Sequence, residues 1–168
     1  MVLVGLPGSG KTTVGRLVAA ALGAPFVDLD QAIEQRAAKS VARIFAEDGE
    51  PAFRALEAAV GGAVLAGPPA VVAPGARFFA HDVTREMSRG SGLVVYLETG
   101  PEEAAARLGD AADRPLLAGG GTGERIAALL AARGSSYRGA DRTVSTGGRS
   151  PDEVAAAVVS LARDLAGW

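Results

Sequence analysis

The sequence predicts an α/β fold with three layers, α/β/α, in which helices cover both faces of a parallel sheet of about five strands. Short apolar runs alternate along the chain with longer segments of helical periodicity, and this alternation is typical of parallel sheets. The runs are apolar at nearly every position, as expected of strands that are buried on both faces. A length of 168 residues with 48% hydrophobic residues suits a single domain over 1–168.

The N-terminal half is expected to hold three strands and four helices. Val14, Leu17 and Val18 place apolar side chains on one side of the first helix, and Gly23 suits its end. The predicted strands span about 2–4, 25–28 and 70–73, and the predicted helices run from the turn 5–10 to Gly23 and over about 30–37, 41–47 and 50–65.

The C-terminal half is expected to add two strands and three helices. The best-marked start is that of the last helix, where Ser150 can cap, Pro151 suits the first turn and Glu153 completes a capping box. The glycine-rich loop at about 109–123 is expected to be mobile. The other predicted elements are a buried strand at 93–97, helices at about 101–107 and 124–133, and a weak strand at 143–145.

Composition excludes several classes of function. The chain has 17 basic and 19 acidic side chains, which leaves no broad cationic surface for a nucleic-acid backbone. It has no cysteine, which excludes thiolate metal sites, disulfides and cysteine nucleophiles. The single histidine, His81, stands in a polar stretch and is expected at the surface; alone it cannot form a multi-histidine metal centre.

Nothing in the sequence suggests a membrane or an export signal. No run of about 18 apolar residues is present, and the apolar start at 1–4 meets glycines and a lysine rather than a cleavage site. We therefore expect a cytoplasmic monomer whose partner is a small molecule rather than a membrane or a nucleic acid.

Residues 5–12 match the phosphate-loop motif G-x-x-x-x-G-K-[ST] in full, directly after a predicted strand and before a predicted helix. Backbone N–H groups of such a loop turn inward on a phosphate, Lys11 reaches the β- and γ-phosphates, and the Thr12 hydroxyl can ligate Mg²⁺. The alternative is a glycine-rich turn that only starts a helix. The motif predicts nucleotide binding by Gly8, Ser9, Gly10, Lys11, Thr12 and Thr13.

Two aspartates follow the second predicted strand. Asp28 and Asp30 stand at i and i+2, so in extended geometry both carboxylates point toward the crevice at the ends of the strands. One could hold Mg²⁺ and the other a substrate hydroxyl. Alternatively, Asp30 caps a helix that begins at Gln31, and the two roles can coexist.

A third candidate group lies on the predicted helix at 50–65. Arg54 and Glu57 stand at i and i+3 beside an apolar stripe that includes Phe53. Taken alone, they form an ordinary surface ion pair. A guanidinium is also well suited to bind a carboxylate or a phosphate.

Together these segments resemble the shikimate kinase family of P-loop small-molecule kinases over nearly the whole chain. The order and spacing of the segments carry the resemblance, since only the phosphate loop is specific by itself. The matching segments are 5–16, 26–30, 40–45, 48–50, Phe53 and Arg54 with Glu57, 94–97, 114–117, and Arg133 followed by Tyr137.

The resemblance implies a P-loop kinase fold with a mobile lid at about 109–123 and a substrate-binding region at about 29–58, and it implies ATP and Mg²⁺ as cofactors. It implies that Asp28, with Thr12, positions the metal and that Asp30 contacts the substrate hydroxyl. The other implied roles are transition-state charge stabilisation by Lys11 and Arg114, nucleotide contacts by Arg107 and Arg149, and substrate binding by Arg54, Gly75 and Arg133.

The sequence departs from the family on the acceptor side. Three consecutive glycines follow the third strand in the family, but only Gly75 remains here, and Ala76 and Arg77 would crowd or recharge that place. The family's P-L-Y is also changed to Ser135, Ser136 and Tyr137. Either the acceptor has changed, with Arg77 adding a contact to it, or transfer has weakened. Arg77 could also be a solvent-facing helix start.

The predicted function is ATP-dependent phosphorylation of a hydroxyl of shikimate or a closely related small cyclic hydroxy acid. The first alternative is a P-loop kinase of another small polyol, and the second is a nucleotide-binding protein with little transferase activity.

Overall fold

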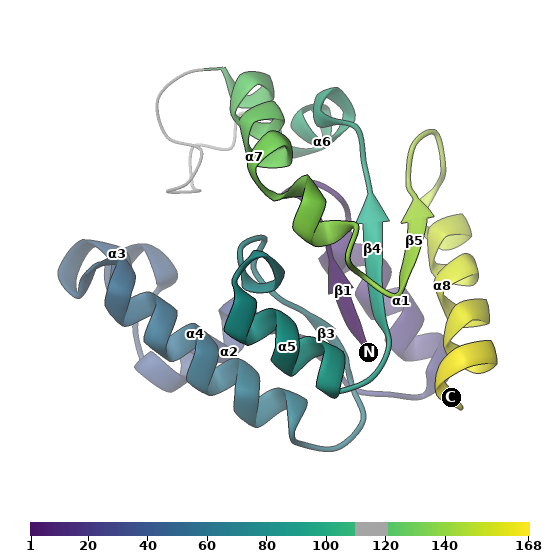
Figure 1. Ribbon diagram of the computed structural model, residues 1–168, viewed down its shortest axis with the longest axis horizontal. Coiled ribbons are helices and arrows are strands. Elements are labelled where there is room, and N and C mark those ends of the chain that lie inside the picture. Colours follow the sequence, from purple (N-terminus) through teal and green to yellow (C-terminus); the bar gives the residue numbers. More distant parts are fainter. Residues whose placement is uncertain (110–120) are drawn as a thin grey trace.

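The structure is a computed structural model that describes residues 1–109 and 121–168, and within them the strands form one five-stranded sheet (Figure 1). All pairings are parallel and the order is β2-β3-β1-β4-β5. Val2 in β1 pairs with Val72 in β3 and with Val94 in β4, so β1 lies at the centre. The strands are β1 (Val2–Val4), β2 (Phe26–Asp28), β3 (Val71–Ala73), β4 (Val94–Glu98) and β5 (Arg142–Ser145).

The described helices occupy the segments between these strands and the segment after the last one. They are α1 (Lys11–Leu22), α2 (Leu29–Ala37), α3 (Val41–Glu47), α4 (Gly49–Leu65), the short 3₁₀ helix η1 (Phe78–Ala80), α5 (Asp82–Gly90), α6 (Pro101–Leu108), α7 (Thr122–Tyr137) and α8 (Pro151–Ala166). None of the helices in the described ranges is long and apolar enough to cross a membrane.

Helices cover both faces of the sheet. Leu3 and Val95 pack against α1 and α8 on one face, where Figure 1 shows these two helices side by side. Val2, Val4 and Tyr96 point the other way and pack against α6, α7 and η1. Because successive residues of the central strands are buried on opposite faces, the predicted three-layer arrangement and parallel sheet are confirmed.

A separate apolar cluster holds α2, α3 and α4 together at one side of the sheet. Leu29 and Ile33 in α2 pack with Ile44 in α3, Phe53 in α4 and Phe78 in η1. All five side chains are at most 4% exposed. This cluster fixes the segment 29–58, predicted to bind substrate, against the end of β3 through Phe78.

The sequence prediction missed one helix and shortened another. No helix was expected over 82–90, because the buried face of α5 is polar: it consists of Thr84 and Ser88. Their hydroxyls donate to backbone carbonyls, as Ser88 Oγ does to Thr84 O at 2.7 Å, so no apolar stripe is needed. Helix α7 was expected to end at 133 but runs to Tyr137, whose buried ring stacks on Tyr96 at 5.4 Å and holds the last turn.

Candidate active site

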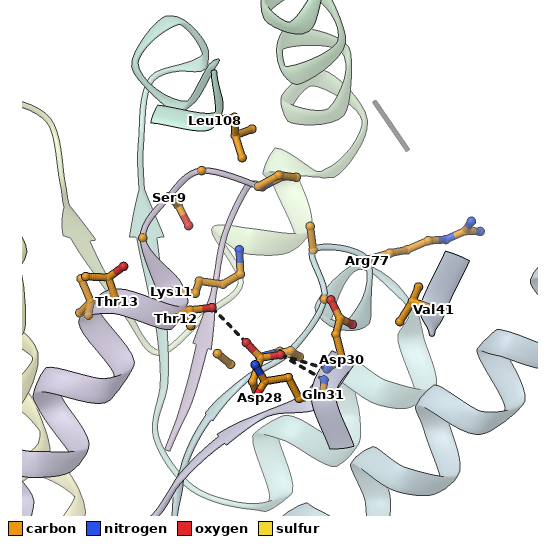
Figure 2. A pocket seen from close by; sticks show the side chains of 18 of the residues that line it. Ser9, Lys11, Thr12, Thr13, Asp28, Asp30, Gln31, Val41, Arg77 and Leu108 are labelled. Carbon is orange, nitrogen blue, oxygen red and sulfur yellow. Dashed lines mark hydrogen bonds between the residues drawn. The ribbon is translucent and has the colours of Figure 1, made fainter. Parts of the chain in front are cut away.

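A cavity of about 860 Å³ opens at the carboxyl ends of the strands, the place where parallel α/β sheets bind ligands. The phosphate loop follows β1, Asp28 ends β2, the turn 74–77 follows β3 and Thr146 follows β5. Segments far apart in the sequence therefore line one space. Figure 2 shows part of this lining, with the side chain of Lys11 pointing into the space between the loop and the aspartates.

The phosphate loop takes a conformation that favours glycine, as Gly8 and Gly10 show. Gly8 has φ of 80° and Gly10 has φ of 90°, a region that other residues rarely adopt. A Cβ on Gly8 would also lie 2.3 Å from the carbonyl oxygen of Ala104 in α6. Gly10 is the N-cap of α1, so the positive end of the helix dipole lies at the cavity wall together with the backbone N–H groups of the loop.

Two side chains of the loop add donors to this wall. Ser9 is 1% exposed, and its Oγ has no hydrogen-bond partner within the described ranges; leaving a buried hydroxyl unpaired costs free energy. Lys11 Nζ donates to the carbonyl oxygens of Gly5 (2.9 Å) and Leu6 (2.7 Å), which keeps its ammonium at the loop. A phosphate seated here can accept from both groups.

Asp28 connects the phosphate loop to the start of α2. Thr12 Oγ1 donates to Asp28 Oδ2 at 3.1 Å, and Asp28 Oδ1 accepts from the N–H groups of Asp30 (3.2 Å) and Gln31 (3.4 Å) (Figure 2). The idea that Asp30 caps the helix is therefore wrong. An N-cap residue has extended backbone, which Asp28 has, whereas Asp30 already lies within α2, which begins at Leu29.

Asp30 instead shares the acceptor side of the cavity with Gly75 and Glu57. A Cβ on Gly75 would lie 3.3 Å from Asp30 Oδ1 and 3.2 Å from Glu57 Oε1. Two carboxylates from α2 and α4 therefore approach one backbone position after β3. A side chain at position 75 would be in tight contact with both carboxylates, which would have to shift by a few tenths of an ångström.

Arg54 is held by two carboxylates and two aromatic rings. Its Nη1 donates to Glu57 Oε2 at 2.6 Å and its Nε to Glu50 Oε1 at 3.2 Å, while its guanidinium carbon lies 4.9 Å from the ring centroid of Phe53 and 5.9 Å from that of Phe45. Glu57 is only 4% exposed, so the pair is not the ordinary surface ion pair that the sequence allowed. Burial raises the pKa of Glu57, and the bond from Arg54 opposes that rise.

Arg77 is exposed and begins η1, as the simplest interpretation of the sequence expected. It also has a specific partner, because its Nη1 donates to Glu50 Oε1, the same oxygen that accepts from Arg54. The carbonyl oxygen of Ala76, its neighbour in the turn, accepts from the hydroxyl of Tyr137 in α7. Both residues are thus tied to neighbouring helices.

Arg133 does not line the cavity as far as the structure describes it. It stands one turn before Tyr137 on α7, and its Nη1 is buried with no hydrogen-bond partner in the described chain. Burial raises the pKa of Tyr137 to about 12, against the positive charge of Arg133 nearby. Arg54 and Arg133 were expected on one cavity wall, but of the two only Arg54 lines the cavity in the described structure.

The opposite end of the cavity holds Arg107 on a buried pair of hydroxyls. Thr99 and Thr146 are buried, and their Oγ1 atoms lie 2.6 Å apart. Arg107 Nη1 donates to Thr146 Oγ1 (3.2 Å), and its Nη2 donates to Thr146 O (3.0 Å) and to Glu103 Oε1 (2.6 Å). Arg149 lines the same end and donates to two backbone carbonyls.

Most predicted site residues thus meet in one cavity. It is lined by Gly8, Ser9, Gly10, Lys11, Thr12, Thr13, Asp28, Asp30, Arg54, Gly75, Arg107 and Arg149. Arg114 and most of the predicted lid lie outside the described residues. Two lining residues that bond to predicted site residues were not assigned a role from the sequence. Glu57 could have been indicated only by its spacing from Arg54, and no sequence signal marked Thr146.

The family model described as shikimate kinase matches residues 7–163. The chain belongs to the shikimate kinase family. The matched range includes every residue that lines the cavity, so the family assignment covers the site as well as the fold. The chain is accordingly an ATP-dependent phosphotransferase of the shikimate kinase type.

Individual shikimate kinases agree with this assignment over nearly the full chain. The enzyme of Thermobifida fusca (strain YX) is 48% identical over 155 residues, 92% of this chain and 89% of the relative. That of Mycobacterium avium (strain 104) is 45% identical over 160 residues, 95% and 90% of the two chains. A structure of shikimate kinase from Acinetobacter baumannii in complex with shikimate has a TM-score of 0.92 at 33% identity, covering 97% and 92% of the two chains.

Proposed function

We propose that shikimate is the acceptor of this kinase and that it binds between Asp30, Arg54 and Gly75, facing the phosphate loop. One observation carries the proposal: a carboxylate and a fixed guanidinium share a single cavity with the phosphate loop. A guanidinium suits the carboxylate of a hydroxy acid, and a carboxylate suits its hydroxyl groups. The solved relative named with shikimate supports the same choice.

Mg²⁺ is part of the proposal, and the residues present fit it. Thr12 Oγ1 and Asp28 Oδ2 lie 3.1 Å apart at the loop and would hold the ion, since Mg²⁺ favours one or two such protein oxygens together with phosphates and water. Within the described ranges no group of three or more His, Asp or Glu side chains could hold a metal alone. When bound, Mg²⁺ would neutralise charge on the β- and γ-phosphates.

The proposed transfer depends mainly on positioning. Arg54 orients the acceptor by binding the acceptor's carboxylate. Asp30 accepts the proton of the acceptor hydroxyl while the hydroxyl oxygen bonds to the γ-phosphorus and the bond between the γ-phosphorus and ADP breaks. Lys11 and the loop N–H groups stabilise the negative charge that moves onto the leaving phosphates. We assign Arg107 and Arg149 to the nucleotide at the other end of the cavity, which they line.

Two further arginines belong to the proposal on the family pattern. Arg133 is assigned to the acceptor carboxylate; its buried, unpartnered Nη1 and its position one turn from Tyr137, which is bonded to the turn 74–77, support this role. Arg114 is assigned to the phosphates, as the resemblance implies. We also propose a monomeric, cytoplasmic enzyme, and size-exclusion chromatography with light scattering tests the first of these points.

A coupled assay of ADP release tests the acceptor. Shikimate should stimulate release strongly, whereas the methyl ester of shikimate, which keeps the hydroxyls but lacks the charge, should need a much higher concentration. In Arg54→Ala the difference between the acid and the ester should shrink, because one of the two guanidinium groups proposed to bind the carboxylate is gone. Stimulation by a different polyol alone would reassign the acceptor, and ATP binding with no stimulated release would contradict transferase activity.

A further inference from the structure

The acceptor site contains an ion-pair chain that reaches from its centre to its rim. Glu57 Oε2 accepts from Arg54 Nη1 (2.6 Å), Glu50 Oε1 accepts from Arg54 Nε (3.2 Å), and the same Glu50 oxygen accepts from Arg77 Nη1. Arg77 stands in the turn after β3, two residues beyond Gly75. The chain of ion pairs therefore links this turn with the guanidinium proposed to bind the acceptor.

The charges along this chain affect an acidic acceptor. Asp30, Glu50 and Glu57 are the acidic side chains near Arg54, and negative charge on each of them lowers the affinity of Arg54 for a substrate carboxylate. Arg77 offsets one of them through its contact with Glu50. The positive charge of Arg77 also acts on Glu57. Burial raises the pKa of Glu57, and Arg77 is among the charges that oppose that rise.

The position of Arg77 favours an indirect role. Its side chain extends away from Lys11 and from the bonded pair of Thr12 and Asp28 (Figure 2), and it is 45% exposed. Its nearest described charge partner is on α4, not on the phosphate loop. Arg77 lines the outer part of the cavity, and its Nη1 is bonded to Glu50.

We propose that Arg77 is a positioning residue, which strengthens binding of an acidic acceptor by neutralising Glu50, the carboxylate that it shares with Arg54. The inference rests on the proposed acceptor site. The proposal also predicts that the effects of substituting Arg77 and Glu50 are coupled. Two residues that contacted the acceptor independently would show additive effects.

A double-mutant cycle tests this coupling. Arg77→Gln should raise the KM for shikimate about two- to fivefold, the range of an exposed ion pair, with the KM for ATP and kcat nearly unchanged. Arg77→Lys keeps the charge and should restore the affinity. In a Glu50→Gln background, Arg77→Gln should have no further effect. Arg85→Gln, which removes an exposed pair with Asp82 on α5, is the matched control and should leave both KM values unchanged.

Salt gives a second readout that a purely structural role would not move. Because exposed pairs are screened, the difference in KM between the wild-type protein and Arg77→Gln should shrink at about 0.5 M salt. Thermal unfolding of each variant verifies that it is folded. An unchanged KM in Arg77→Gln, or the same loss with and without Glu50, would overturn the inference.

Failure of this inference can be distinguished from failure of the proposed function. If shikimate is not the acceptor, the wild-type protein itself shows no shikimate-stimulated ADP release. If only the inference is wrong, the wild-type protein and the Arg54 variants behave as proposed, and the cycle between Arg77 and Glu50 shows no coupling.

Discussion

The two sides of the cavity differ in what holds them in place. The phosphate loop is one continuous segment, and its conformation depends on backbone geometry at Gly8 and Gly10 and on the start of α1. The acceptor side is assembled from α2, α4 and the turn 74–77, and charged side chains such as Arg54 and Glu57 hold it together. A backbone cradle suits the triphosphate common to many enzymes, whereas side-chain contacts allow the acceptor site to change residue by residue.

The largest expected effect is on the phosphate side. Lys11→Ala should lower kcat/KM for ATP by at least about 10²- to 10³-fold, because a preorganised charge at the transferred phosphoryl group is lost. ADP release at saturating shikimate and varied ATP measures this ratio. Lys39→Ala is the control, since Lys39 is the other lysine of the chain and pairs with Glu47 and Asp48 outside the cavity. Similar losses in the two variants would contradict the assignment.

A smaller and more selective effect is expected on the acceptor side. Arg54→Ala should raise the KM for shikimate about 10- to 100-fold, the range of hydrogen bonds between charged groups, and leave the KM for ATP nearly unchanged. Arg43→Ala, which removes an exposed pair with Glu47 on α3, is its control. An unchanged KM for shikimate in Arg54→Ala would contradict the assignment of Arg54 to the acceptor side.

Asp28 lies where the two sides meet, and Asp28→Asn tests its role. Asparagine still accepts from the N–H groups that start α2, but the carboxylate beside Thr12 is lost. The Mg²⁺ concentration for half-maximal activity should rise about tenfold, as when a partner of a metal ligand is removed. A Mg²⁺ titration with an unchanged midpoint and normal unfolding would argue against a metal at this position.

The smallest effect is expected in stability against pH. Burial raises the pKa of Glu57 above its ordinary value of 4.5, so the folded state favours the protonated acid. That contribution is fully present below pH 4.5 and is lost as pH rises through the higher pKa of the folded state. The stability of the wild-type protein relative to Glu57→Gln should therefore fall as pH increases from 4.5, measured by denaturant unfolding. A constant difference would mean that Arg54 cancels the effect of burial.

The sequence predicted the sheet and the phosphate loop well because both depend on local patterns. Apolar runs define buried strands, and the loop motif is contiguous. It failed at α5, where Thr84 and Ser88 face inward without an apolar stripe, and at Asp28, where a shift of two residues decides which aspartate caps α2.

The acceptor side was only partly predictable because its contacts join distant segments. Spacing on one helix suggested the pair of Arg54 and Glu57, but not that Glu57 would be buried against Gly75. Arg77 finds its partner 27 residues away on α4, and Arg107 is supported by Thr146, which follows β5. Both contacts depend on tertiary structure that no local pattern encodes.

Helix α7 spans sixteen residues, a stiff rod of about 24 Å at the usual rise per residue. Its final residue, Tyr137, is fastened to the carbonyl of Ala76, and its opposite end emerges from the stretch that carries Arg114. The far end of α7 is therefore tied to the turn that contains Gly75, more than 60 residues earlier in the sequence.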